Sequence, residues 1–298
     1  MALTGTQFTI SAGDFEATVV EVGGGLRRFT HRGLDVTAAY AEDELPPRGD
    51  GGVLMPWPNR LAGGRYCFEG VHLQVPVTEF PALNANHGLA RWVRWTAVTH
   101  ELDSVTLAHR IVPQTGWPFE VSLAVTYSLD AQNGLTVAAS AFNEGTRTAP
   151  FGAGFHPYLA LHGTPLDDII LQIPAHSRLL TDAARIPSAS TPVAGSEYDF
   201  RSERRLGSLR LDDAFTGLAF VAGASGVLLR AGERGARVWW DESFGYTQVF
   251  TADELAHHAP AVAVEPMTCP ADAFNSGDGL IVLAPGQSWN GNWGITPL

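Results

Sequence analysis

The sequence of 298 residues contains no lysine, because all 19 of its basic residues are arginine. Schiff-base chemistry needs an amine nucleophile, and P-loop NTPases hold phosphate with the lysine of a GxxxxGK motif. The absence of lysine therefore excludes pyridoxal-phosphate enzymes, lysine aldolases and P-loop NTPases.

Metal-binding patterns are equally scarce. The two cysteines, Cys67 and Cys269, are far apart and neither belongs to a CxxC or Cys/His pattern, so no structural zinc site is expected. The neighbours His257 and His258 would point in opposite directions on an extended chain, which disfavours a shared metal. The sequence also lacks HExxH, GxSxG, dinucleotide-binding and EF-hand signatures. We expect no metal, no cofactor and an activity that survives chelation.

Positive charge is in short supply, since 31 acidic residues oppose 19 basic ones and give a formal charge of -12. This charge repels polyanions, so neither nucleic acid nor an anionic membrane is an expected partner. The first 16 residues lack the basic and apolar regions of a signal peptide, and the longest apolar run, at 218–229, is interrupted by Gly and Ser. We expect a cytoplasmic monomer or homodimer with a small-molecule substrate.

Helical periodicity is missing as well, because no segment of twelve or more residues repeats its apolar positions every 3.6 residues. Short segments with alternating polarity predict strands instead. These segments are 8–11, 17–22, 105–112, 120–129, 135–142, 227–230, 236–240, 246–250, 261–265 and 280–283. Asn133-Gly134 predicts a tight antiparallel hairpin over 119–142. With no linker or change of composition, residues 1–298 are expected to form a single all-β domain, a large antiparallel sandwich with few short helices.

Three polar clusters stand beside Gly or Pro, where loops at strand ends carry binding groups. Each taken alone is an ordinary turn or a site. They are Pro56-Trp57-Pro58-Asn59-Arg60, Asn84-Ala85-Asn86-His87-Gly88 and Gly154-Phe155-His156-Pro157-Tyr158.

Glu265 is a fourth feature, at the end of an apolar strand and directly before Pro266. Its carboxylate is either capped locally or part of a site. Partial burial would raise its pKa and make it a better proton acceptor near neutrality.

In chain order, these clusters resemble motifs of the aldose 1-epimerase (galactose mutarotase) family, from about residue 50 to the end. The matching stretches are Asn59–Gly70, Asn84-x-x-His87-Gly88, Gly154–Tyr158, Asp212-x-x-Phe215, Val264–Thr268, and Ile281–Leu283 with Pro285-Gly286. The resemblance implies a galactose mutarotase-like β-supersandwich. It also implies an isomerase that interconverts the α and β anomers of a free hexose.

The resemblance implies residue roles too. Glu265 matches the general base that takes the proton of the anomeric hydroxyl, and His156 matches the acid that protonates the ring oxygen. Arg60, His87 and Asp212 match positions that bind sugar hydroxyls. Asp213 is the alternative to Asp212. Asn59 and Trp57 complete the expected substrate-binding set.

Two other functions stay open. The Pro-Trp-Pro sequence before Asn59 resembles a bacterial branch that includes sulfosugar mutarotases, so the substrate is alternatively an anionic sugar, phosphorylated or sulfonated. Such a sugar needs an arginine clamp, for which the candidates are Arg91, Arg94, Arg204 and Arg205. The third possibility is a non-catalytic carbohydrate-binding module on the same fold.

The chemistry sets an expected geometry. Arg60, His87, His156, Asp212 and Glu265 should line one cleft, with His156 and Glu265 on opposite sides of one pyranose ring, roughly 5–8 Å apart. Aromatic faces should cover the apolar patches of the sugar. The candidates are Trp57, Phe155, Tyr158, Trp240 and Phe244.

Overall fold

The computed structural model describes residues 2–255 and 259–298, so His257 and His258 lie outside the described residues. Strands hold 51% of the residues and helices 4%, which confirms the all-β prediction. One short α-helix, α1 (Ala273–Ser276), is present in the described part, together with the 3-10 turns η1 (Pro47–Gly49), η2 (Ala62–Gly64) and η3 (Leu166–Asp168).

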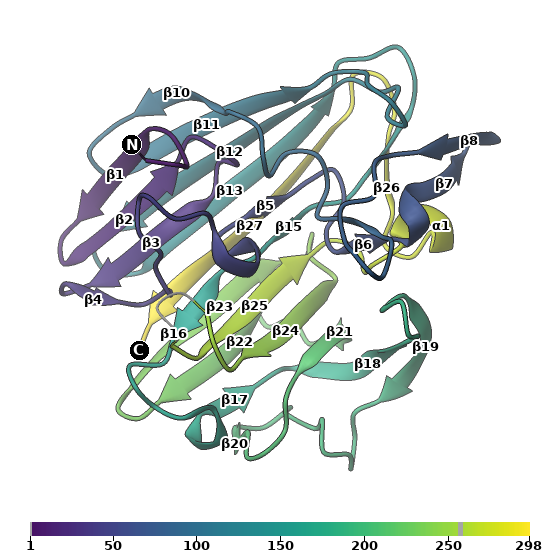
Figure 1. Ribbon diagram of the computed structural model, residues 1–298. Helices are drawn as coiled ribbons and strands as arrows, with labels where there is room; N and C mark the ends of the chain where they lie inside the picture. The colour runs from purple at the N-terminus through teal and green to yellow at the C-terminus, as the bar shows by residue number, and fades with distance from the viewer. Residues whose placement is uncertain (1, 256–258) are drawn as a thin grey trace.

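A nine-stranded antiparallel sheet forms one layer of the molecule (Figure 1). Its strands, in spatial order, are β10 (Thr96–His100), β11 (Ser104–Ile111), β12 (Val121–Asp130), β13 (Gly134–Asn143), β27 (Ser288–Pro297), β23 (Arg234–Asp241), β22 (Ala224–Ala231), β17 (Ile170–Gln172) and β20 (Arg204–Arg205). The predicted hairpin is confirmed, because β12 pairs with β13 from Val121 opposite Asn143 to Asp130 opposite Gly134.

An eight-stranded sheet carries the Gly154–Tyr158 cluster and Glu265. In spatial order it contains β19 (Pro187–Pro192), β18 (Ala175–Thr181), β21 (Asp212–Leu218), β24 (Tyr246–Ala252), β25 (Ala261–Met267), β15 (Gly154–Phe155) and β5 (Val53–Leu54), with β16 (Tyr158–Ala160) also paired to β25. Strand β25 does not end at Glu265 as predicted. It continues to Met267, with Pro266 opposite Thr247 of β24.

The remaining strands form smaller sheets. They are β1 (Gln7–Ala12), β2 (Phe15–Val20), β3 (Leu26–His31) and β4 (Leu34–Asp35) in one sheet, and the pairs β6 (Arg60–Leu61) with β9 (Ala85–Asn86), β7 (Arg65–Phe68) with β8 (Val71–Gln74), and β14 (Ala149–Phe151) with β26 (Ile281–Leu283).

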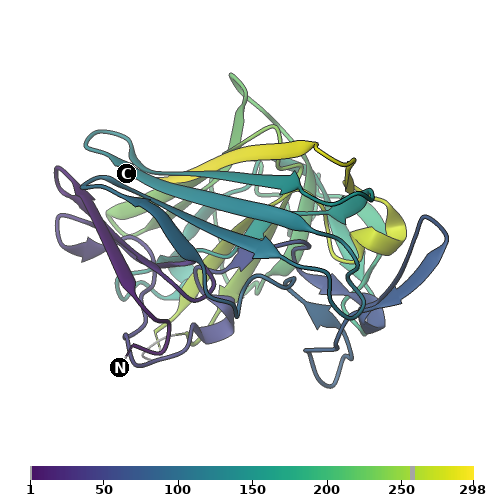
Figure 2. The same cartoon turned by 90° about the horizontal axis from the view of Figure 1, so that it is seen from above.

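The two large sheets form the layers of the molecule (Figure 2), and one continuous apolar core fills the space between them. Phe155 of the eight-stranded sheet meets Trp293 of the nine-stranded sheet, with ring centroids 5.0 Å apart. Both rings are almost fully buried. Alternation along β12 explains this layer, because every second side chain from Val121 to Leu129 is buried. The sandwich therefore supplies a rigid base, and the strand ends and loops above the eight-stranded sheet are free to hold polar groups.

No helix among the described residues is both long enough and apolar enough to span a lipid bilayer.

Candidate active site

A polar cavity of about 440 Å³ opens above β21, β24 and β25 of the eight-stranded sheet. This volume lies in the range of pockets that enclose small organic ligands. Its walls are η1, the ends of β6 and β9, and the turn before β19. The lining residues are Pro46, Arg48, Gly49, Asn59, Arg60, Asn86, His87, Arg91, Trp92, His156, Tyr158, Arg185, Asp212, Gln248, Phe250 and Glu265.

The five residues expected to share one cleft all line this cavity, and so does Asn59. These residues are far apart in the sequence, so the fold brings them together. Glu265 and Asp212 lie on strands of the large sheet, whereas Arg60 and His87 come from the small β6–β9 sheet beside it. His156 lies between β15 and β16.

His156 and Glu265 form a buried pair at the floor of the cavity. His156 Nε2 lies 3.2 Å from Glu265 Oε1, and the two side chains are 6% and 3% exposed. The predicted separation of 5–8 Å is wrong. Strands β15 and β16 both pair directly with β25, and neighbouring strands are only about 4.8 Å apart, which leaves no room for a sugar ring between the two side chains.

Burial controls the protonation of this pair. It raises the pKa of Glu265 to about 8, despite the opposing charge of Arg60. Burial, followed by the charge of Arg91, lowers the pKa of His156 to about 3. Desolvation favours the neutral form of both groups, so near neutral pH the pair holds a single mobile proton. The second polar atom of each side chain, His156 Nδ1 and Glu265 Oε2, has no hydrogen-bond partner among the described residues.

His87 is held in place by two reciprocal hydrogen bonds with Asn59. The Asn59 backbone N–H donates to His87 Nδ1 at 3.2 Å, and the His87 backbone N–H donates to the Asn59 carbonyl at 2.8 Å. Because Nδ1 accepts, the proton of the neutral ring is on Nε2. Burial, followed by the charges of Arg91 and His156, holds the pKa of His87 well below its usual range.

The glycine after His87 is required by close packing. Gly88 has φ +70°, and a Cβ there would lie 2.1 Å from the Met55 carbonyl oxygen. Any larger residue at position 88 would push the backbone next to His87 away from Met55. This close contact accounts for the His-Gly pair in the sequence.

Arg60 is held in place by Glu79. The guanidinium donates three hydrogen bonds of 2.7–3.0 Å to the two carboxylate oxygens, and Asn84 donates to the same carboxylate at 3.1 Å. Burial alone would raise the pKa of Glu79, but the hydrogen bonds from Arg60 and Asn84 outweigh it and the pKa is lowered. Glu79 does not line the cavity but orients Arg60, and the sequence analysis did not predict it.

Asp212, and not its neighbour, faces the cavity. Gln248 Nε2 donates to Asp212 Oδ1 at 2.8 Å, and Arg185 forms an ion pair with the same carboxylate. Asp213 does not line the cavity and pairs with Arg178 at 2.6 Å. Gln248 was also missed, although a glutamine inside the apolar strand 246–252 is a recognisable signal of a buried polar contact.

The aromatic wall differs from the one expected. Of the five candidates, Tyr158 lines the cavity, and its ring stacks on His156 with centroids 4.9 Å apart. Trp57 lies in the core, where its indole N–H donates to the Ala85 carbonyl at 3.3 Å. Phe155, Trp240 and Phe244 are also buried in the core. The exposed Trp92 and the half-buried Phe250 line the cavity instead.

Two arginines of the cavity have no counter-ion. No carboxylate of a described residue lies within 4.0 Å of the guanidinium of Arg48 or Arg91, and Arg91 Nε is buried without a hydrogen-bond partner. Of the expected clamp candidates, Arg91 alone lines this cavity. Arg94 pairs with Glu21 at 2.6 Å elsewhere, and Arg204 and Arg205 form the distant strand β20.

Asp50 supports the floor from behind. It is 3% exposed, its Oδ2 has no partner, and burial raises its pKa well above the usual range. The nearby backbone amides of Tyr158 and Gly51 partly oppose this rise in pKa. The loop on either side pairs with the His156 backbone, because Gly51 N–H donates to the His156 carbonyl at 2.9 Å.

Within residues 2–255 and 259–298, no group of three or more His, Cys, Asp or Glu side chains is arranged to hold a metal ion.

Comparison with known proteins shows the family to which the chain belongs. A sequence model described as aldose 1-epimerase matches residues 6–296. The chain belongs to the aldose 1-epimerase family. It is 33% identical over 287 residues to the uncharacterized protein YihR of Escherichia coli K12, covering 96% of this chain and 92% of that protein. It is 30% identical over 166 residues to rat galactose mutarotase, covering 53% and 46% of the two chains.

Solved structures share the fold of this family member. The GalM/aldose epimerase homologue of C. elegans superposes with a TM-score of 0.86 at 18% identity and covers 98% of both chains. Galactose 1-epimerase of Lactobacillus acidophilus gives a TM-score of 0.82 at 18% identity, covering 97% of this chain and 93% of that one. These likenesses confirm the predicted galactose mutarotase-like fold.

Proposed function

We propose that this protein is an aldose 1-epimerase that opens and recloses the hemiacetal of a free hexose at the His156–Glu265 pair. The observation that carries the proposal is this buried pair at 3.2 Å, on the floor of a cavity that hydrogen-bonding side chains surround. Family membership supports an epimerase, and the pair supplies a local mechanism.

The short separation suits the reaction. The anomeric hydroxyl and the ring oxygen are both bonded to C1, so the groups that deprotonate one and protonate the other must themselves be neighbours. The sugar therefore lies over the pair and not between its members. Glu265 takes the hydroxyl proton, His156 gives a proton to the ring oxygen, and the C1–ring oxygen bond breaks to leave the open aldehyde. Rotation about C1–C2 and the reverse transfers give the other anomer.

The proton inventory is balanced by the coupled pair. Opening moves one proton from the anomeric hydroxyl to the pair and one from the pair to the ring oxygen, so the pair ends with the single proton it began with. The resting proton lies on Glu265, as the pKa directions indicate. Its transfer to His156 across 3.2 Å generates the carboxylate base and the imidazolium acid together. Arg60, His87 and Asp212 are placed to hold the sugar hydroxyls while C1 reacts.

The direct test follows anomer exchange in freshly dissolved α-D-glucose and α-D-galactose by polarimetry. Catalysed exchange should exceed the spontaneous rate and vanish when Glu265 is replaced by Gln. Exchange no faster than the spontaneous rate for every aldose and sugar acid tried would leave the non-catalytic binding module as the better reading.

A second candidate function is epimerisation of an anionic sugar, phosphorylated or sulfonated. The specific observation is that Arg48 and Arg91 face the cavity without a carboxylate partner, in a protein whose net charge is -12. Arginine binds phosphate and sulfonate oxygens with paired hydrogen bonds. The cost of leaving two guanidinium groups unpaired beside a site is offset when an anion binds there.

The two candidates are separated by matched substrates and variants. If the substrate is anionic, Arg91→Gln should lower kcat/KM at least about tenfold for a hexose 6-phosphate or a 6-sulfonated hexose, and leave the neutral hexose nearly unchanged. Arg94→Gln is the control, because Arg94 pairs with Glu21 outside the cavity. Equal losses for neutral and anionic substrates would assign Arg91 to general binding and favour the neutral hexose.

A further inference from the structure

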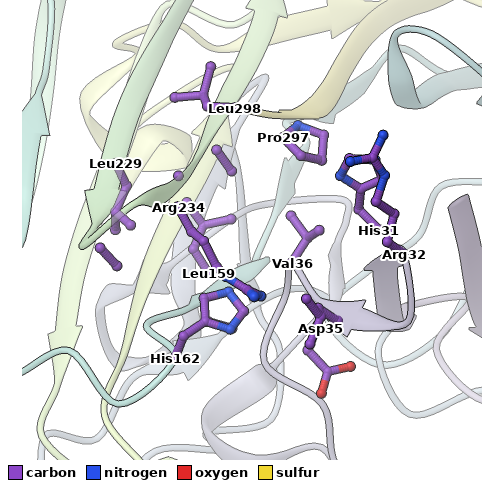
Figure 3. A pocket seen from close by; sticks show the side chains of 15 residues that line it. His31, Arg32, Asp35, Val36, Leu159, His162, Leu229, Arg234, Pro297 and Leu298 are labelled. Atoms are coloured by element: carbon purple, nitrogen blue, oxygen red, sulfur yellow. The ribbon is translucent and has the colours of Figure 1, made fainter. Parts of the chain in front are cut away.

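A second cavity, of about 290 Å³, lies on another part of the surface. The β3–β4 hairpin, β16, the turn between β22 and β23, and the segment 297–298 surround it (Figure 3). None of its lining residues lines the polar cavity that contains His156 and Glu265. The aldose 1-epimerase reaction therefore makes no use of it.

The floor of this second cavity is apolar. Leu159 and Leu229 are each 1% exposed, and Ala231 and Ala236 are 3% exposed. Leu34, at the rim, is 46% exposed, although it is a leucine in a strand. Covering such a concave apolar surface releases water and favours ligands with an apolar body.

The rim carries an unpaired positive charge. No carboxylate of a described residue lies within 4.0 Å of the Arg234 guanidinium. Its side chain approaches His162 (Figure 3). Burial, followed by the charge of Arg234, lowers the pKa of His162, and Asp35 partly opposes this.

The other charges around the cavity are already paired. Arg32 pairs with Asp14 at 3.0 Å, and Asp35 pairs with Arg28 at 2.7 Å. Among the charged side chains of the described lining residues, the exposed Arg234 is thus the one without a counter-ion. A neutral His162 beside it adds a ring N–H that is able to donate a hydrogen bond.

We propose that this second cavity is a binding site for an organic monoanion with an apolar body, such as an aromatic sulfonate or a medium-chain carboxylate. The apolar body covers Leu159, Leu229 and Leu34, and the anionic head pairs with Arg234. An apolar floor beside one cation favours this chemistry, because the apolar body covers the floor and the anionic head gives the exposed Arg234 a charge-assisted hydrogen bond.

The test is calorimetric titration of the whole protein with naphthalene-2-sulfonate and, separately, with octanoate. Both should bind at one site, and 1-octanol, which lacks the charge, should bind at least about tenfold more weakly. Arg234→Gln should weaken naphthalene-2-sulfonate about tenfold. Arg237→Gln removes the same charge from an exposed position of the same strand β23 and should change affinity less than twofold.

A second variant tests the apolar half. Leu34→Ala shortens an exposed side chain, so folding is not at risk, and it should weaken both probes several-fold. Unchanged affinity in Arg234→Gln, an equal loss in Arg237→Gln, or displacement of the probe by saturating hexose would each overturn the proposal. Binding is read without any enzyme assay, so these results do not depend on whether the protein is an epimerase.

Discussion

The polar cavity of about 440 Å³ has a floor, formed by His156 and Glu265, and a wall that includes Arg60 and Asp212. The polar groups of the floor and of the wall are satisfied in different ways. At the wall, Arg60 is already bonded to Glu79, and Asp212 to Gln248 and Arg185, whereas Arg48 and Arg91 have no carboxylate of a described residue within 4.0 Å. At the floor, His156 and Glu265 bond to each other and keep their remaining polar atoms unsatisfied.

This difference separates two tasks. A paired wall holds its donors and acceptors in fixed positions before the sugar arrives, which lowers the entropy cost of binding. An unsatisfied, desolvated floor is costly to the fold, but it brings the proton affinities of a carboxylate and an imidazole into the range that proton transfer requires. We therefore expect changes at the floor to act on kcat and changes at the wall to act on KM.

The largest expected effect is at the floor. Glu265→Gln keeps the size of the side chain but removes the proton acceptor, and His156→Asn removes the donor. Each should lower kcat by at least about a hundredfold, because each positioned proton transfer contributes roughly 10²–10⁴ to the rate. Steady-state polarimetry measures kcat, and sugar binding by calorimetry should survive.

Matched controls for these variants use exposed positions outside the cavity. Glu16→Gln in β2 and His72→Asn in β8 make the same chemical changes far from the cavity and should leave kcat unaltered. Near-normal turnover by Glu265→Gln would remove Glu265 as the base, and the same result for His156→Asn would place the acid elsewhere.

The next effect is on pH dependence. With pKa values of about 3 for His156 and about 8 for Glu265, the pair holds its mobile proton between these limits and loses it as the pH rises through about 8. Activity should then fall about tenfold per pH unit above 8, since no proton remains for the ring oxygen. Groups with ordinary pKa values would lose the imidazolium above about 6.5. A profile of kcat/KM that already declines between pH 6.5 and 7.5 would contradict the coupled pair.

A smaller effect is expected at the wall. Glu79→Gln keeps the size of the side chain. It removes the negative charge that accepts three hydrogen bonds from Arg60 and orients it. KM should rise about tenfold and kcat should change less than threefold, as for a residue that acts through another. Glu203→Gln, which breaks an exposed pair with Arg230, is the control and should alter neither constant. A loss confined to kcat would erase the distinction between floor and wall.

The sequence predicted the floor and the wall unequally. Alternating polarity predicted the strands, because a half-buried strand exposes every second side chain to water. Short motifs beside Gly or Pro singled out His156, Glu265, Arg60 and His87, because Gly and Pro mark the turns that present such groups, and the family resemblance added Asp212. The cavity contains all five. Their catalytic and binding roles remain predictions.

What the sequence did not predict depends on strand pairing and on contacts between distant segments. Glu79 reaches Arg60 across 19 positions, and Gln248 reaches Asp212 across 36. The distance between His156 and Glu265 is set by the pairing of β16 with β25, which no local pattern encodes. Trp57 stands within the right motif but packs into the core, because a large apolar ring gains more from burial there than from the cavity wall.

The smallest expected effect concerns stability. The pKa of Glu265 in the folded protein, about 8, lies above its ordinary value of 4.5, so above pH 4.5 the folded protein keeps a proton that the unfolded chain has lost. Stability from this group is complete below pH 4.5 and is lost as the pH rises through 8. Glu265→Gln has no such dependence. Its melting temperature relative to the wild type should therefore rise by several degrees between pH 5 and pH 8.5, as thermal unfolding followed by circular dichroism would measure. Glu16→Gln changes an exposed acid of β2 outside the cavity and serves as the comparison. A gap between Glu265→Gln and the wild type that stays constant with pH would mean that the carboxyl group is solvated in the folded protein, and the contrast between an unsatisfied floor and a paired wall would then have no energetic basis.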